Sequence, residues 1–251
     1  MEEILGGSLS LYRRNLGMFL AIAAVAVPVG LAAIIGETAI RRAGGNATAT
    51  APLWLANAAV GLIVTGALVH AIANAVDGCA VGFVRSYRQA LDHFGSLFFA
   101  SLRISGVILL IAFPAFFISV GFFIALYRWA LIPVVPLAAL ALCVIVYFLV
   151  RWAFYVQAVV IEDADSPGAL GTSAQIVKGA WWRAFGILFT TAIIVTVIHL
   201  PNLLITYTVS RPAGQVLAAI VGAPLQPFGA GVVTLLFFDL SSRESERVSI
   251  T

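Results

Sequence analysis

The sequence predicts an all-α, polytopic membrane protein, with six transmembrane helices in three hairpins and a cytoplasmic interfacial amphipathic helix before each hairpin. Three observations predict this class. The 251-residue chain is 62% hydrophobic and only 10% charged, whereas soluble domains carry about 25% charged residues. Its apolar residues fall into six long runs. Its few polar and charged residues gather in short stretches between those runs.

Each of the six runs is long enough to cross a bilayer, because about 20 apolar residues in a helix span about 30 Å of hydrocarbon. The runs are residues 16–40, 53–76, 97–127, 131–161, 185–210 and 215–240. The third and fourth are longer than necessary, which predicts tilt or projection beyond the bilayer. We therefore interpret residues 1–240 as one six-helix membrane domain and residues 241–251 as a polar, frayed cytoplasmic tail.

A stretch of mixed character precedes the first, third and fifth runs. In each, apolar residues recur at i, i+4, i+7 and i+11, and most polar residues lie off that face, which predicts an amphipathic helix lying in the membrane interface. The three apolar faces are Leu5, Leu9, Tyr12 and Leu16; Phe83, Tyr87, Ala90 and Phe94; and Leu170, Ala174, Val177 and Trp181.

The third of these stretches has end signals for a short helix. Ser166 is suited to the N-cap, Pro167 to the first helical position and Gly179 to the C-terminal end. A span containing a proline follows each stretch. The chain is therefore predicted to consist of three repeats, each an interfacial helix followed by a transmembrane hairpin.

The distribution of basic residues predicts that both termini lie in the cytoplasm, because cytoplasmic loops are enriched in Lys and Arg. With the N-terminus inside, four cations lie outside, at Arg41, Arg42, Arg128 and Arg211. Ten lie inside: Arg13, Arg14, Arg85, Arg88, Arg103, Arg151, Lys178, Arg183, Arg243 and Arg247. We expect a multi-pass protein of the bacterial cytoplasmic membrane.

Cations on the three amphipathic stretches predict contact with anionic lipid headgroups, since a Lys or Arg near the surface attracts such lipids. The candidate residues are Arg13, Arg14, Arg85, Arg88, Lys178 and Arg183, with Trp181 and Trp182 at headgroup level. The 14 basic residues never form a dense run, so nucleic acid is not an expected partner. Expected partners are membrane lipids and either another membrane protein or a second copy of the chain.

Three charged residues lie within predicted spans, near their cytoplasmic ends: Arg103, Arg151 and Asp239. A charge at that depth is unfavourable unless it pairs or extends to the interface. One hypothesis is an Arg151–Asp239 pair shared with Arg103. The alternative is that each side chain reaches the headgroups independently.

A second polar group is predicted in the outer half of the last two spans, at His199, Asn202 and Gln226. These residues lie beside prolines and glycines that interrupt the helices. Such interruptions line cavities in transporters, but the same residues can also hydrogen-bond between helices around a kink.

Four stretches resemble the membrane-domain family named after glycerophosphoryl diester phosphodiesterase, and related uncharacterised bacterial six-helix proteins. They are 8-SLSLYRRNLGMFLAIAAVAVP-28, 151-RWAFYVQAVVIED-163, the segment from Ala169 to Trp182, and 234-TLLFFDLSSRESER-247. The family's Tyr-Asp-Leu-Arg ending is altered here by Phe238 and Ser241. The resemblance implies the membrane architecture but no activity, because the family's catalytic barrel has no counterpart in this sequence.

No catalytic residue, metal ligand set or cofactor motif is predicted. The 11 acidic residues form no recognisable ligand spacing. Glu162, Asp163 and Asp165 precede a helix start, where they interact favourably with the helix dipole; a cation or substrate site is the alternative. We therefore expect a non-enzymatic scaffold or accessory protein. The alternative is a small transporter or lipid-handling permease with a cavity at His199, Asn202 and Gln226, and a lipid phosphodiesterase is least favoured.

Overall fold

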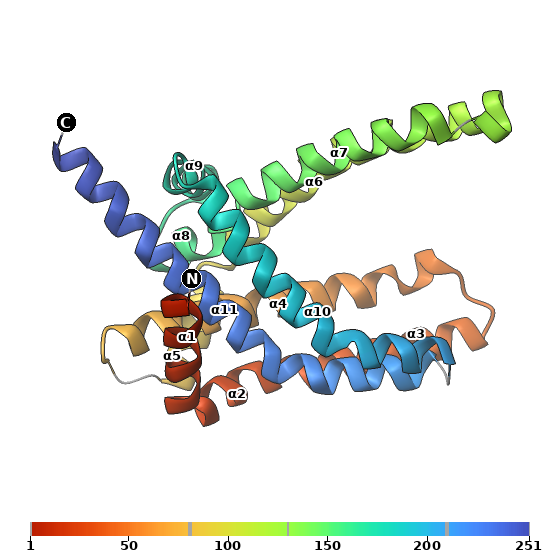
Figure 1. The fold of residues 1–251 in the computed structure, drawn as a ribbon. Helices are drawn as coiled ribbons and strands as arrows, with labels where there is room; N and C mark the ends of the chain where they lie inside the picture. The colour runs from red at the N-terminus through yellow and green to blue at the C-terminus, as the bar shows by residue number, and fades with distance from the viewer. Residues whose placement is uncertain (1, 80–81, 130, 209–210, 251) are drawn as a thin grey trace.

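The structure is a bundle of long helices with several short helices at one end (Figure 1). This computed structural model describes residues 2–79, 82–129, 131–208 and 211–250. Of the residues that the structure describes, 91% are helical and none is in a strand. The predicted all-α class is therefore confirmed.

The helices follow one another with short connections. In chain order they are α1 (Glu2–Arg14), α2 (Leu16–Ala24), α3 (Ala26–Arg42), α4 (Ala47–Val76), α5 (Phe83–Asp92), α6 (Phe94–Leu126), the 3₁₀ helix η1 (Tyr127–Trp129), α7 (Leu131–Arg151), α8 (Tyr155–Ile161), α9 (Ser166–Val177), α10 (Trp181–Thr208) and α11 (Arg211–Ile250). A short helix, α1, α5 or α9, precedes each of α2, α6 and α10, at the three positions that the sequence predicts.

Six segments of the described chain are long and apolar enough to cross a membrane. They are Leu16–Arg42, Ala47–Val76, Phe94–Leu126, Leu131–Ile161, Trp181–Pro201 and Ala213–Glu244. Each overlaps one of the six predicted runs. By length and composition, the chain has the character of a multi-pass membrane protein.

Two predicted runs are interrupted rather than continuous. Between α2 and α3 the helix breaks at Val25, because Pro28 has no N–H to donate to the carbonyl of Ala24. The run 131–161 breaks at residues 152–154, between α7 and α8. Neither proline nor glycine is present there, so the second break needs a tertiary cause, which α9 supplies as described below.

The segment predicted as a polar tail continues helix α11 as far as Ile250. Arg243 donates from Nε to Asp239 Oδ1 at 3.2 Å, one turn earlier. Pairs at i and i+4 stabilise a helix modestly. The last membrane segment therefore leads into a helical extension.

Helix α4 lies at the centre of the packing and contacts α2, α3, α5, α6, α8 and α11. Gly66 permits its closest approaches. A Cβ at Gly66 would lie 3.1 Å from Leu97 Cδ1 on α6 and 3.3 Å from Ala90 Cβ on α5. Small residues at helix interfaces allow such close packing in membrane proteins.

Helix α5 is held to α2 by one buried polar contact. The Tyr87 hydroxyl donates to the Ile22 carbonyl at 2.6 Å, and burial raises the pKa of Tyr87 to about 12. Ala90, on the same predicted apolar face, is fully buried. That face therefore packs against the protein.

Helices α6 and α7 pack on each other and diverge from the other long helices (Figure 1). No residue is buried in the most apolar 18-residue window of either segment. Only their bases, at Leu97, Ala100 and Val150, are buried among other helices. At 33 residues, α6 is about 50 Å long, which exceeds the hydrocarbon thickness as predicted.

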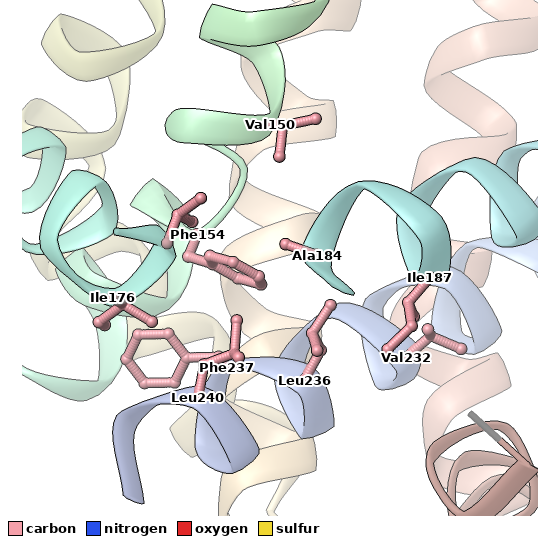
Figure 2. Close-up of a cluster of buried hydrophobic side chains, with 10 residues drawn as sticks. Val150, Phe154, Ile176, Ala184, Ile187, Val232, Leu236, Phe237 and Leu240 are labelled. Atoms are coloured by element: carbon pink, nitrogen blue, oxygen red, sulfur yellow. The ribbon is translucent and has the colours of Figure 1, made fainter. Parts of the chain in front are cut away.

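A buried cluster joins the bases of four helices (Figure 2). Phe154, in the break after α7, points towards Phe237 of α11, with ring centroids 6.1 Å apart. Ile176 of α9 and Ala184 of α10 complete this contact. The cluster fixes where α7 and α10 begin to diverge.

Replacing Tyr87 with Phe should destabilise the protein by about 0.5–1.5 kcal/mol, the net contribution of one hydrogen bond. The unfolded tyrosine pKa is about 10, so the stability from neutral Tyr87 is fully present below pH 10 and lost as pH rises through about 12. The unchanged protein should lose thermal stability in detergent as the pH rises from about 10 to about 12. Tyr87→Phe should not show this loss. Tyr127→Phe, at a residue 77% exposed, is the control, and an equal effect there would contradict the assignment.

Candidate functional site

The predicted headgroup cations lie on the short helices at one end of the bundle. In Figure 1, α1, α5 and α9 lie on the side of the molecule from which the C-terminal part of α11 projects, whereas η1 and the α3–α4 connection lie on the opposite side. Arg13, Arg14, Arg85, Arg88 and Lys178 are exposed. In the described part of the chain, none of these five has an acidic partner within 4.0 Å.

The sixth predicted cation, Arg183, is paired. Its Nη2 lies 2.9 Å from Asp239 Oδ2, without hydrogen-bond alignment, so the contact is electrostatic. Arg243 binds the other carboxylate oxygen. Asp239 thus pairs with Arg183 and Arg243, and the predicted pairing with Arg151 or Arg103 is not found among the described residues. The reason is proximity, because α10 packs directly against α11.

The N-cap of α9 is Asp165, one residue before the predicted cap Ser166. Asp165 has the extended backbone of an N-cap, and its Oδ1 accepts from the Gly168 N–H at 2.9 Å. Ser166 is already helical, and its buried hydroxyl has no hydrogen-bond partner. At the other end Gly179 has a φ of +86°, a conformation that favours glycine, as predicted.

The buried face of α9 is rotated from the predicted one. Ala169, Ser173 and Ile176 are buried together with Val177, which belongs to the predicted face, whereas Leu170, Ala174 and Trp181 are half-buried. The reason is that Ser173 binds the chain break after α7. As a result, Ala174, with Gln175 and Lys178, faces a cavity.

Ser173 supplies the polar contacts that the break after α7 requires. Its hydroxyl accepts from the Phe154 N–H at 3.2 Å and donates to the Arg151 carbonyl at 2.9 Å. The side chain is fully buried. Because a broken helix leaves backbone groups without partners, this hydroxyl stabilises the end of α7 and fixes Arg151 relative to α9.

A polar pocket of about 550 Å³ lies beside this junction, between the end of α7, α9 and the start of α10. Arg151, Gln175 and Lys178 line it, and no acidic residue does. Arg151 donates from Nη1 to the Tyr147 hydroxyl at 2.8 Å, with its guanidinium carbon 5.9 Å from the centre of that ring. The pocket therefore has an uncompensated positive charge.

An apolar groove of about 880 Å³ lies next to the pocket, between α7 and α10. Tyr147 and Trp181 line both. Trp181 stacks on Phe185 at 5.2 Å between ring centroids, and Phe185 stacks on Phe189 at 5.5 Å. These rings form one wall of the groove, and Trp182 and Phe189 are exposed along it.

A smaller polar pocket of about 200 Å³ is lined by residues that include His70, Asn74 and Asp163. His93 Nε2 lies 2.9 Å from Asp163 Oδ1, and His93 Nδ1 lies 2.9 Å from the Gln89 carbonyl. Both ring nitrogens thus face oxygen atoms. Within the described residues, no three His, Cys, Asp or Glu side chains are placed to hold a metal ion.

Two of the three polar residues predicted for the outer half, Gln226 and His199, lie at helix contacts. Gln226 Nε2 donates to Thr65 Oγ1 of α4 at 3.4 Å, and His199 lies 3.7 Å from where a Cβ on Gly222 would be. The side chain of Asn202 is outside the described part of the structure. The three cavities described above are lined by other residues.

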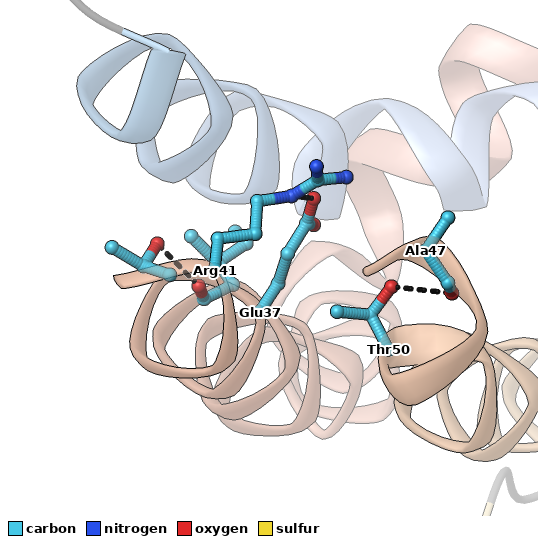
Figure 3. Close-up of polar contacts among 6 residues, drawn as sticks. Glu37, Arg41, Ala47 and Thr50 are labelled. Atoms are coloured by element: carbon cyan, nitrogen blue, oxygen red, sulfur yellow. Dashed lines mark hydrogen bonds and ion pairs between the residues drawn. The ribbon is translucent and has the colours of Figure 1, made fainter. Parts of the chain in front are cut away.

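An ion pair that the sequence reasoning missed lies at the end of α3 (Figure 3). Arg41 Nε donates to Glu37 Oε1 at 2.7 Å, one turn apart. Nearby, the Thr50 hydroxyl donates to the Ala47 carbonyl at 2.9 Å in the first turn of α4. The i and i+4 spacing of Glu37 and Arg41 was the sequence signal that could have predicted this ion pair. The pair places charge at the end of the bundle opposite α9.

Residues 2–243 match the family described as a domain of unknown function, DUF7847. The chain belongs to this family. No curated protein and no solved structure matches the chain. The phosphodiesterase membrane-domain family, which the sequence was predicted to resemble, is not among these matches. That resemblance stays a prediction.

Replacing Ser173 with Ala should destabilise the protein by about 1–3 kcal/mol, because the buried Phe154 N–H and Arg151 carbonyl would lose their side-chain partner. Thermal unfolding in detergent measures this. Thr191→Ala is the matched control, since the buried Thr191 hydroxyl donates only within its own helix, to the Ile187 carbonyl. Equal destabilisation by both changes would contradict a special role for Ser173.

Proposed function

We propose that this DUF7847 protein is a non-enzymatic scaffold or accessory protein of the bacterial cytoplasmic membrane, whose cytoplasmic face contacts anionic lipid headgroups. One observation supports this most strongly. Five exposed cations, Arg13, Arg14, Arg85, Arg88 and Lys178, lie on or next to short helices at the same end of the bundle and have no acidic partner among the side chains that the structure describes. Each such cation attracts anionic lipid by about 1 kcal/mol.

The proposed topology is three transmembrane hairpins with both termini in the cytoplasm. Its support is the packing of α3 on α4, α6 on α7 and α10 on α11, together with the gathering of α1, α5 and α9 at one end (Figure 1). The excess of basic residues at that end favours the cytoplasm for it.

A transporter with a cavity at His199, Asn202 and Gln226 has less support. Gln226 is hydrogen-bonded to a neighbouring helix, and His199 lies against α11. These contacts favour a structural role in joining helices.

The native Cys79 tests the topology, because its side chain is exposed in the connection between α4 and α5. With Cys143 replaced by Ser, a membrane-impermeant maleimide should label Cys79 in inverted vesicles and not in intact cells. Adding Ala43→Cys to a Cys79→Ser, Cys143→Ser chain gives the opposite control, at an exposed site near the other end. Labelling of Cys79 from outside the cell would overturn the proposal.

Neutralising the five exposed cations to Gln should reduce the anionic lipid that is co-extracted with the protein in native-membrane nanodiscs, since about 1 kcal/mol of attraction is lost at each position. Lipid mass spectrometry measures the ratio of anionic to zwitterionic lipid. Arg42→Gln, at the other end of the bundle, should leave that ratio unchanged. If the five-residue variant retains both its lipid ratio and its associated proteins, the proposed function fails.

A further inference from the structure

The polar pocket beside Arg151 and the apolar groove between α7 and α10 adjoin each other, and together they form an amphipathic site. The pocket carries Arg151 and Lys178 and has no acidic lining residue. The groove is bounded by side chains such as Leu142, Val146 and Phe185. Because Tyr147 and Trp181 line both, a single molecule can lie in both parts. Its polar end must be anionic and its remainder apolar.

We propose that the junction of α7, α9 and α10 binds one anionic glycerophospholipid, with its phosphate beside Arg151 and Lys178 and its acyl chains along the groove. This inference rests on the proposed function, because it assigns a defined site to one part of the lipid-contacting face. It names a resident lipid, distinct from lipids that exchange freely around the bundle.

The charge arrangement favours an anion in the pocket. Asp239, the carboxylate predicted to pair with Arg151, instead pairs with Arg183 and Arg243. Arg151 keeps only the neutral Tyr147 hydroxyl as its partner, and Lys178 has no acidic partner among the described residues. Guanidinium and phosphate groups form strong charge-assisted hydrogen bonds, so a phosphate would compensate both cations.

The positions of the two cations are set by the fold. Ser173 holds the Arg151 carbonyl to α9, and Lys178 caps the C-terminal end of the same helix. Gln175, one turn before, adds an amide that can donate to a phosphate oxygen. The polar groups thus come from two elements fixed to each other, as binding sites require.

The aromatic residues fit a lipid at the boundary between headgroup and chain. Tyr and Trp are enriched at that level of the membrane. Tyr147 and Trp181, whose ring centroids lie 6.2 Å apart and stacked, stand where the polar pocket meets the groove. Volumes of about 550 and 880 Å³ lie within the range of about 300–1,000 Å³ typical of ligand pockets.

Native mass spectrometry of the delipidated full chain in a mild detergent tests the site. Phosphatidylglycerol and phosphatidylcholine with identical acyl chains are titrated separately. Phosphatidylglycerol should saturate at one molecule per chain and bind more tightly. Arg151→Gln with Lys178→Gln should weaken its binding about 30-fold, from the attraction of two cations.

The charge-matched control is Arg42→Gln with Arg103→Gln, which removes two exposed cations outside both the pocket and the five proposed headgroup cations and should leave one-to-one binding unchanged. For the groove, Ala192→Trp should weaken phosphatidylglycerol binding, because Ala192 lines it. Ile193→Trp, exposed on the same helix but outside the groove, should not. Thermal unfolding of each variant checks that it folds, and Arg151→Lys should retain most of the binding.

Inorganic phosphate and glycerol 3-phosphate are competitors without acyl chains, and neither should displace the lipid. If either does so at the lipid's concentration, the pocket binds soluble anions and the proposal is overturned. Equal weakening by both charge pairs, or equal affinity for the two lipids, would also overturn it. The proposed function would survive failure of the lipid site if the five-residue variant still loses anionic lipid in native-membrane nanodiscs. Failure of the site and failure of the proposed function are therefore distinguishable.

Discussion

The break between α7 and α8, held by the Ser173 hydroxyl, is the constraint on which the end of the bundle that carries α9 depends. Backbone groups freed within a membrane segment have no water to bind, so protein groups must satisfy them. Ser173 does this from α9, and α8 can then turn inward. Residues 156–160 are consequently all buried, packed mainly against α4 and α9, and Phe154 enters the cluster at the base of α10 and α11. Without the break, one straight helix would carry these residues away from the centre.

The same constraint determines which charges are compensated. The Asp239 carboxylate lies on α11 between Arg183 and Arg243, and α10 and α11 lie side by side. Arg183 and Arg243 therefore form ion pairs with Asp239. Arg151 is held by its backbone to α9 and by its side chain to Tyr147, facing a pocket with Lys178. An excess positive charge remains at a fixed position, at the edge of the apolar region.

Composition and periodicity predicted the helical class, the six long apolar segments and the three short helices, because those depend on local sequence and on the length needed to cross a bilayer. They did not predict the break at residues 152–154, since Trp152, Ala153 and Phe154 are all compatible with a helix. The buried face of α9 coincides with the predicted apolar face only at Val177, for a related reason. In so apolar a stretch two neighbouring stripes are equally plausible, and only the tertiary contact of Ser173 distinguishes them. The partner of Asp239 likewise depends on which helices are adjacent. Tyr147 and Gln175, which complete the polar pocket, gave no motif signal.

The groove between α7 and α10 follows from side-chain size. In a bilayer there is no hydrophobic force that closes two apolar helices, and close association depends on small residues or polar contacts at their interface. Around Gly66 of α4 those conditions are met, and α5 and α6 approach to van der Waals contact. The facing surfaces of α7 and α10 carry Leu142, Val146, Phe185 and Phe189 instead, and the two helices touch mainly at their bases, where Val150 and Ala184 are buried. Bulky side chains keep their upper parts apart. A gap of this kind within the hydrocarbon region excludes water, and acyl chains are the material available to fill it.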